Sequence, residues 1–103
     1  MHDAKTDGNH TLIAEAARWA GVTVANTHRL GEGFPDQAWG VDGLNLLVEV
    51  KTDKGKLTPR EAVFHATWRG QLVIVRTPEQ AVAEIEKWKQ IAAWLKEAQC
   101  QQS

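Results

Sequence analysis

The sequence predicts a single α/β domain with a mixed sheet, whose elements follow the order α-β-β-β-α-β-α. An Asp42-Gly43 pair lies between two alternating apolar runs, which is the strongest short-range signal of an antiparallel hairpin. Thr58 and Thr77 are each followed by proline, which is typical of a helix start. The apolar run 72–75 lies between those two helices, so we expect it to pair in parallel with the second strand of the hairpin.

The first helix is expected to begin near Gly8 or Asn9 and to end before Gly21. Asn9 is a good N-cap residue, and Gly21 is a typical C-terminal stop. Residues 22–26 predict a short strand at the edge of the sheet, followed by a loop over 27–34. The core-facing residues of the helix recur at helical spacing: Leu12, Ile13, Ala16, Ala17 and Ala20.

The register of the hairpin places two acids opposite each other. With Asp42 and Gly43 as the two loop residues, counting outward pairs Asp36 with Glu49. Side chains alternate along a strand, so Lys51 shares the face of these acids. Like charges directly opposite each other are destabilising, so the pair needs a cation, a proton or a slipped register. The other face is apolar and predicts the core: Trp39, Val41, Leu44, Leu46, Val48 and Val50.

Glu49 breaks a local rule of its strand, because acids are poor strand residues and its neighbours are valines. Mg²⁺ prefers oxygen ligands, which Asp36, Glu49 and the backbone carbonyl of Val50 could provide. Lys51 could polarise the attacking water or neutralise charge that builds on a phosphodiester oxygen. The pattern predicts a metal-dependent nuclease with Asp36, Glu49 and Lys51 as its catalytic residues.

The second half of the chain carries two clear helix starts. Thr58, Pro59 and Glu61 match a capping box, and this helix should continue to Gly70. The strand over 72–75 is continuously apolar, which predicts a central position with both faces buried. The last helix is expected over about 78–99, roughly 33 Å long at 1.5 Å per residue.

The last helix has more apolar surface than one packing face needs. Its core stripe is expected to be Val82, Ile85, Trp88, Ala92 and Leu95. Ile91, Trp94 and Ala98 lie to one side of that stripe, so we expect a homodimer through this helix; a helix end that projects and frays is the alternative. We expect the remaining tryptophans in the core or half-buried beside it: Trp19, Trp39, Trp68 and Trp88.

The acidic pattern carries a resemblance to a known superfamily. Pro35-Asp36 followed by Glu49-Val50-Lys51 resembles the signature of the PD-(D/E)XK nucleases, and segments 31–36, 47–51, 57–59 and 64–70 together resemble small phage-type VRR-NUC nucleases over about residues 7–83. The resemblance implies a restriction-endonuclease-like α-β-β-β-α-β core, dependence on Mg²⁺ or Mn²⁺, and cleavage of DNA, often at junctions or flaps. It also implies a bacterial or phage-infected host cell.

Two positions depart from the pattern of these nucleases. They often carry a further acid on the first helix, where this chain has Leu12; Glu15, one turn later, is the acid available as a third metal ligand. Gln37 follows Asp36 where an apolar residue is more usual. The core face of this hairpin is therefore expected to begin only at Trp39.

Composition indicates one globular domain over residues 1–103, with 43% hydrophobic residues, 24% charged residues and a net charge of −1. DNA contacts would therefore need a local basic patch, and the alternative for the same residues is a solvated loop.

Cys100 is the only cysteine and Ser103 the only serine, which argues against disulfides, a cysteine-based zinc site and a serine or cysteine nucleophile. No membrane span or signal peptide is expected, so the default location is the cytoplasm. The candidate DNA-binding residues are Lys54, Lys56 and Arg60, with Arg29, His65, Arg69 and Arg76 as further contributors.

Several residues keep two interpretations. Glu61 could contact a metal through water, but the capping box explains it fully; His65 lies one turn later and could pair with it or be structural. His10 and His28 lack the spacing of a zinc site. Two other functions also stay open: a catalytically silent nucleic-acid-binding module, and a structural or interaction protein that uses its last helix.

Overall fold

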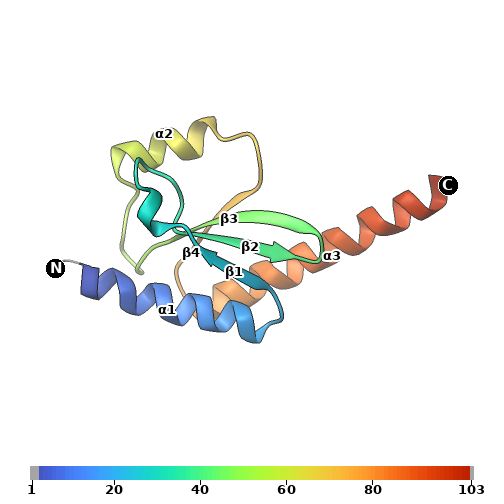
Figure 1. Ribbon diagram of the computed structural model, residues 1–103, viewed down its shortest axis with the longest axis horizontal. Helices are drawn as coiled ribbons and strands as arrows, with labels where there is room; N and C mark the ends of the chain where they lie inside the picture. Colours follow the sequence, from blue (N-terminus) through green and yellow to red (C-terminus); the bar gives the residue numbers. More distant parts are fainter. Residues whose placement is uncertain (1–2, 103) are drawn as a thin grey trace.

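The computed structural model describes residues 3–102. Its element order matches the predicted α/β order, with a mixed four-stranded sheet and a long C-terminal helix (Figure 1). The elements are α1 (Asp3–Trp19), β1 (Thr23–Asn26), the 3₁₀ turn η1 (His28–Leu30), β2 (Gln37–Val41), β3 (Leu44–Val50), α2 (Pro59–Thr67), β4 (Leu72–Val75) and α3 (Pro78–Gln102).

The sheet has the strand order β1-β2-β3-β4, with β1, β2 and β3 antiparallel and β4 parallel to β3. The predicted hairpin register is confirmed, since Val41 pairs with Leu44 and Ala38 with Leu47. Asp42 and Gly43 both have positive φ, 50° and 94°, as a two-residue hairpin turn requires. The central position predicted for 72–75 is wrong. β4 is an edge strand that pairs with β3 alone among the described strands, and three of its four residues are only half-buried.

Helices α1 and α3 cover one face of the sheet, and α2 lies on the other side (Figure 1). The covered face carries the side chains predicted for the core, among them Trp39, Leu46 and Val48, each no more than 1% exposed. They pack against the residues that α1 and α3 bury, which include Ile13, Ala17 and Ile85. The alternation of the hairpin therefore works as expected, and the side chain of Glu49 lies on the opposite face, toward α2.

Helix α1 begins earlier than expected, at Asp3. Asn9 is therefore not an N-cap; it lies inside the helix, and its Nδ2 donates to the Lys51 carbonyl at 2.9 Å. The predicted end is confirmed, because backbone hydrogen bonds from Gly21 to Arg18 and from Val22 to Ala17 close the helix in the pattern of a Schellman motif.

Two apolar residues of α1 lie outside the core, against expectation. Leu12 is 54% exposed and Trp19 is 91% exposed. The buried stripe runs instead through Ile13, Ala14 and Ala17, because these residues face the sheet and α3. Helical spacing in a sequence predicts an apolar face that is wider than the area one neighbouring element covers. Residues at the edge of that face are therefore predicted to be buried but are exposed in the structure.

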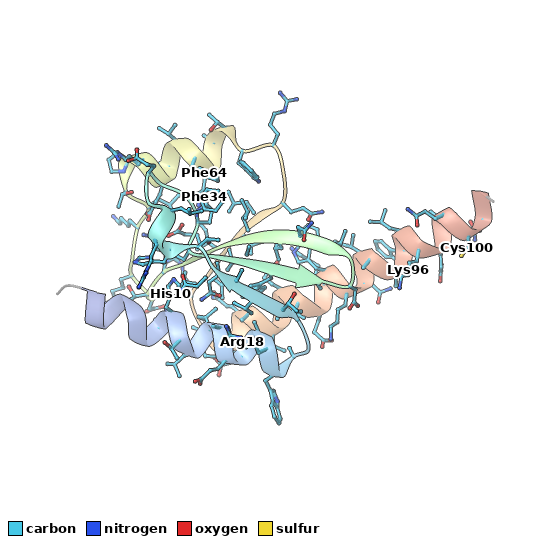
Figure 2. The ribbon with its side chains drawn as sticks, in the orientation of Figure 1. His10, Arg18, Phe34, Phe64, Lys96 and Cys100 are labelled. Carbon is cyan, nitrogen blue, oxygen red and sulfur yellow. The ribbon has the colours of Figure 1, made fainter. Side chains whose placement is uncertain are left out.

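Helix α2 begins at the predicted capping box. The Glu61 N–H donates to Thr58 Oγ1 at 3.2 Å, and the Thr58 N–H donates to Glu61 Oε1 at 2.9 Å. The helix ends at Thr67 rather than Gly70, because Trp68 adopts extended backbone angles. The Trp68 ring stacks on the Phe64 ring with centroids 5.0 Å apart. Phe64 in turn makes an edge-to-face contact with Phe34, in the loop after η1 (Figure 2). This aromatic contact holds α2 against the loop that leads to Asp36.

Helix α3 runs three residues beyond its expected end. Ala81, Ile85 and Ala92 are its buried residues, whereas Val82 and Leu95, predicted for the core, are 38% and 48% exposed. The C-terminal part of α3 projects past the sheet (Figure 1). Residues 93–101 are all exposed, and Trp94 is 61% exposed. No helix within residues 3–102 is long and apolar enough to cross a membrane.

Candidate active site

Two buried acids meet where β2 begins and β3 ends. Asp36 directly precedes β2, and Glu49 is the second-last residue of β3; they are 7% and 1% exposed. Asp36 Oδ2 accepts the N–H of Val50, the residue that follows Glu49, at 2.9 Å. Lys51 follows β3, with its Nζ 3.7 Å from Glu49 Oε2. The hairpin register thus brings together the three residues predicted to be catalytic.

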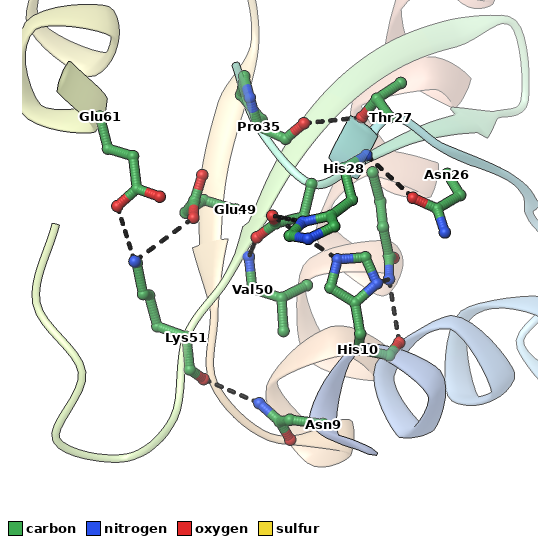
Figure 3. Close-up of polar contacts among 12 residues, drawn as sticks. Asn9, His10, Asn26, Thr27, His28, Pro35, Glu49, Val50, Lys51 and Glu61 are labelled. Atoms are coloured by element: carbon green, nitrogen blue, oxygen red, sulfur yellow. Dashed lines mark hydrogen bonds and ion pairs between the residues drawn. The ribbon is translucent and has the colours of Figure 1, made fainter. Parts of the chain in front are cut away.

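Asp36 is held by donors on both of its oxygens. Oδ2 accepts the Val50 N–H at 2.9 Å, and Oδ1 lies 3.1 Å from His28 Nδ1 and 3.7 Å from His10 Nε2 (Figure 3). Burial by itself would raise the pKa of this carboxyl, but His10, the Val50 amide and His28 outweigh burial and hold the pKa below its usual range. Asp36 is therefore ionised at neutral pH.

Glu49 has the opposite environment. Burial, followed by the negative charge of Asp36, raises its pKa to about 9. Its Oε1 is buried and makes no hydrogen bond with a described residue, although His65 Nε2 lies 3.9 Å away. An unpartnered buried carboxyl oxygen beside an ionised carboxylate suits an oxygen-preferring divalent cation, which would replace the proton on Glu49.

Lys51 is positioned by helix α2. Its Nζ lies 2.7 Å from Glu61 Oε1 (Figure 3). The same oxygen accepts the backbone N–H of Thr58 in the capping box. Burial opposes ionisation of Glu61, but Lys51 and the Thr58 amide together lower its pKa. The capping interpretation of Glu61 is confirmed, and the same carboxylate directs the Lys51 ammonium toward Glu49.

His65 lies inside this cluster rather than on an outer DNA-binding surface. Its side chain is 15% exposed and faces Glu49. Burial lowers its pKa, partly opposed by Glu61, so the ring is neutral at pH 7. A water molecule or a substrate oxygen between His65 Nε2 and Glu49 Oε1 would satisfy both unpartnered atoms.

Two histidines at the site were missed by sequence reasoning. His10, His28 and Asp36 each offer a ligand atom, and these atoms lie within 4.8 Å of one another. The sequence interpretation, that His10 and His28 lack the spacing of a zinc site, did not include this contact, which forms because α1, η1 and the start of β2 converge although they are separate in the chain. No local spacing signals this contact, since it arises from the way α1 crosses the sheet.

Other predicted site residues lie outside the acid pair. Glu15 is exposed, and within the described part of the chain no hydrogen bond or ion pair joins it to Asp36 or Glu49. Helix α1 contributes His10 to the site instead. The N–H of Val50 binds Asp36, while its carbonyl remains a predicted ligand.

The predicted basic patch is divided. Lys54, Lys56 and Arg29 are exposed. Arg60 is also exposed and lies 3.0 Å from Glu32, in a surface ion pair of little energetic value. Arg76 is not available as a contributor, because its Nη1 donates to the carbonyls of Thr52 and Gly55 and fixes the loop after β3.

An open groove of about 690 Å³ continues along the face that carries the acids. Ala38 and Leu47, one pair further along the hairpin on the same face, form part of its floor, and Trp68 and Gln71 line its other side. The groove thus provides a surface that leads away from Asp36 and Glu49.

Comparison of the chain with protein-family models, with curated proteins and with solved structures gives no match.

Proposed function

We propose that this protein is a metal-dependent endonuclease that hydrolyses DNA phosphodiester bonds. The observation that carries the proposal is the meeting of buried Asp36 and Glu49 with Lys51, in which Glu49 Oε1 is left without a partner. Burying two neighbouring acids destabilises a fold, so a purely structural sheet gains nothing from them. The resemblance of these residues to the PD-(D/E)XK signature supports the same chemistry.

The residues have distinct roles in this proposal. Asp36, Glu49 and the Val50 carbonyl would hold Mg²⁺ or Mn²⁺, which supplies an activated water and stabilises charge on the phosphodiester when bound. Lys51, held by Glu61, donates to a nonbridging phosphate oxygen or orients the water. Neutral His65 accepts a hydrogen bond from a water or substrate hydroxyl near Glu49.

DNA is the proposed substrate, in junction or flap form as the resemblance implies. Exposed Lys54, Lys56, Arg60 and Arg29 would bind phosphates, and the groove beside Ala38 and Leu47 would accept part of a strand. We also propose a homodimer through the projecting end of α3, where Trp94 and Leu95 are exposed. A monomeric mass in light scattering at micromolar concentration would contradict the dimer. The cytoplasm of a bacterial or phage-infected cell is the proposed location.

The test is cleavage of a labelled panel of four-way junction, flap, duplex and single strand, with Mg²⁺, Mn²⁺ or EDTA. We expect metal-dependent cleavage that is lost in Lys51→Ala, because this variant removes the ammonium group and keeps all the residues proposed to bind the metal. Lys54→Ala is the matched control; it should weaken binding in a salt-dependent manner and leave the chemical step intact. Cleavage by Lys51→Ala at the wild-type rate would contradict the assignment.

A catalytically silent DNA-binding module is the second candidate. One observation favours it: the acid expected on the first helix is absent from the site, since Leu12 and Glu15 are exposed and His10 faces Asp36. It predicts salt-dependent DNA affinity without product under any metal condition. An interaction protein that uses only α3 predicts neither DNA affinity nor cleavage.

A further inference from the structure

A buried chain of hydrogen bonds runs from Trp39 through Gln37 to His10, whose ring lies beside Asp36. Trp39 Nε1 donates to Gln37 Oε1 at 2.9 Å, and Gln37 Nε2 donates to the His10 carbonyl at 3.0 Å. The same Nε2 lies 3.2 Å from His10 Nδ1. Trp39, Gln37 and His10 are 1%, 1% and 6% exposed, so solvent does not compete for these contacts.

These contacts determine the orientation of the Gln37 amide. An indole N–H can only donate and a backbone carbonyl can only accept. Turning the amide over would set donor against donor at Trp39 and acceptor against acceptor at the His10 carbonyl. The second amide N–H therefore faces His10 Nδ1, which must accept it.

The orientation of Gln37 in turn sets the tautomer of His10. With Nδ1 as an acceptor, the neutral ring carries its proton on Nε2. That nitrogen has no hydrogen-bond partner among the described residues and lies 3.7 Å from Asp36 Oδ1. His10 thus presents an N–H to Asp36.

We propose that Gln37 and His10 are positioning residues for Asp36 and that they restrict the site to oxygen-preferring cations such as Mg²⁺ and Mn²⁺. His10, His28 and Asp36 have the donor atoms of a transition-metal site. However, a histidine that binds a metal through Nε2 usually donates its Nδ1–H to an acceptor, and here a donor occupies that place. His10 therefore points an N–H toward Asp36 and does not act as a metal ligand.

This arrangement explains a residue that the fold alone does not require. Gln37 lies on the core face of β2, beside Trp39, where the resemblance predicts an apolar side chain. Its oxygen and nitrogen are both used by the contacts to Trp39 and His10. The side chains of Gln37 and His10 thus fix each other's orientation. Only the role of Asp36 as a metal ligand rests on the proposed nuclease function.

The first test is the tautomer of His10, measured by long-range ¹H–¹⁵N NMR on the metal-free protein at a pH where the ring is neutral. We expect the proton on Nε2 in the wild type. In Gln37→Glu the proton should move to Nδ1, because the introduced carboxylate accepts there. A proton on Nδ1 in the wild type would overturn the proposal, and this measurement needs no nuclease activity.

The second test measures Zn²⁺ affinity by calorimetry and Co²⁺ ligation by visible absorption. We expect His10→Ala to leave the Co²⁺ absorption spectrum of the wild type unchanged, because the ring is not a ligand, and Gln37→Glu to raise Zn²⁺ affinity about tenfold or more, a gain that the double variant with His10→Ala loses. A Co²⁺ spectrum that loses a nitrogen ligand in His10→Ala would show that His10 is already a ligand. If Gln37→Glu fails to fold, the wild type and His10→Ala still decide the question.

Discussion

The two ends of the β2–β3 hairpin are stabilised in opposite ways. At the turn, Asp42 and Gly43 are exposed and adopt the positive φ angles that their residue types favour. At the other end, Asp36 and Glu49 are buried beside each other and depend on α1, η1 and α2 for their partners. The turn end forms through local preferences, whereas the site end depends on contacts between elements that are far apart in the chain.

The largest effect is expected from the same substitution made at each end. Asp36→Asn should reduce cleavage about 1,000-fold or more, equivalent to about 4 kcal/mol, because it removes the ionised oxygen donor. Asp42→Asn should leave cleavage unchanged, since asparagine tolerates the left-handed conformation of the turn. Cleavage rates and circular dichroism spectra of both variants provide the check. Equal activity of the two variants would mean that the buried acids do not take part in the chemistry.

The proton on Glu49 should make metal binding depend on pH. Because burial and Asp36 raise the pKa of Glu49 to about 9, Mg²⁺ must displace a proton below that pH. The dissociation constant should therefore fall about tenfold per pH unit as pH rises from about 6 toward 9, and then level off. Calorimetry in buffers of different ionisation enthalpy measures both the affinity and the proton released. A pH-independent affinity with no proton release would contradict a protonated Glu49.

Glu49→Gln should stabilise the metal-free protein at alkaline pH. A folded pKa above the ordinary value of 4.5 means that the contribution of Glu49 to stability is complete below about pH 4.5 and is lost as pH rises through about 9. The variant should therefore melt a few degrees higher than the wild type at pH 8, roughly what 1 kcal/mol gives in a domain of this size. The difference should shrink at pH 5. A variant that is less stable than the wild type at pH 8 would show that the carboxyl group supports the fold.

The smallest effect is expected at the turn. Gly43 has φ of 94°, and a Cβ added there would meet no atom within 4 Å, so Gly43→Ala incurs only the conformational penalty. We expect a loss of about 1 kcal/mol in the free energy of unfolding and no change in cleavage. Urea denaturation with a parallel activity assay tests this. A loss of activity without a loss of stability would mean that the two ends of the hairpin are coupled.

Elements with local signals could be predicted from the sequence. The hairpin register followed from Asp42-Gly43, and the start of α2 followed from Thr58 and Glu61, because every group involved lies within a few residues of its partner. Helix faces were harder to predict. Leu12, Val82 and Leu95 have the right spacing for the core yet are exposed, since burial depends on where the partner element stops.

The residues of the candidate site also differ in whether the sequence could predict their positions. The register was enough to predict that Asp36, Glu49 and Lys51 share one face. It did not predict that Glu61 would direct Lys51, or that His65 would lie at Glu49. Those contacts depend on how α2 is placed by the aromatic contact between Phe34 and Phe64, which no sequence spacing specifies.

The sequence by itself determined the order of the elements, the hairpin register and the face on which the acids lie, because turn chemistry, capping and alternation act between neighbouring residues. Only the tertiary structure decided that β4 is an edge strand and that His10 lies between Gln37 and Asp36. His10 and Gln37 are 27 residues apart. Contacts over such separations depend on packing of whole elements, and hydrogen-bond direction is then set by whichever donors and acceptors the packing brings together.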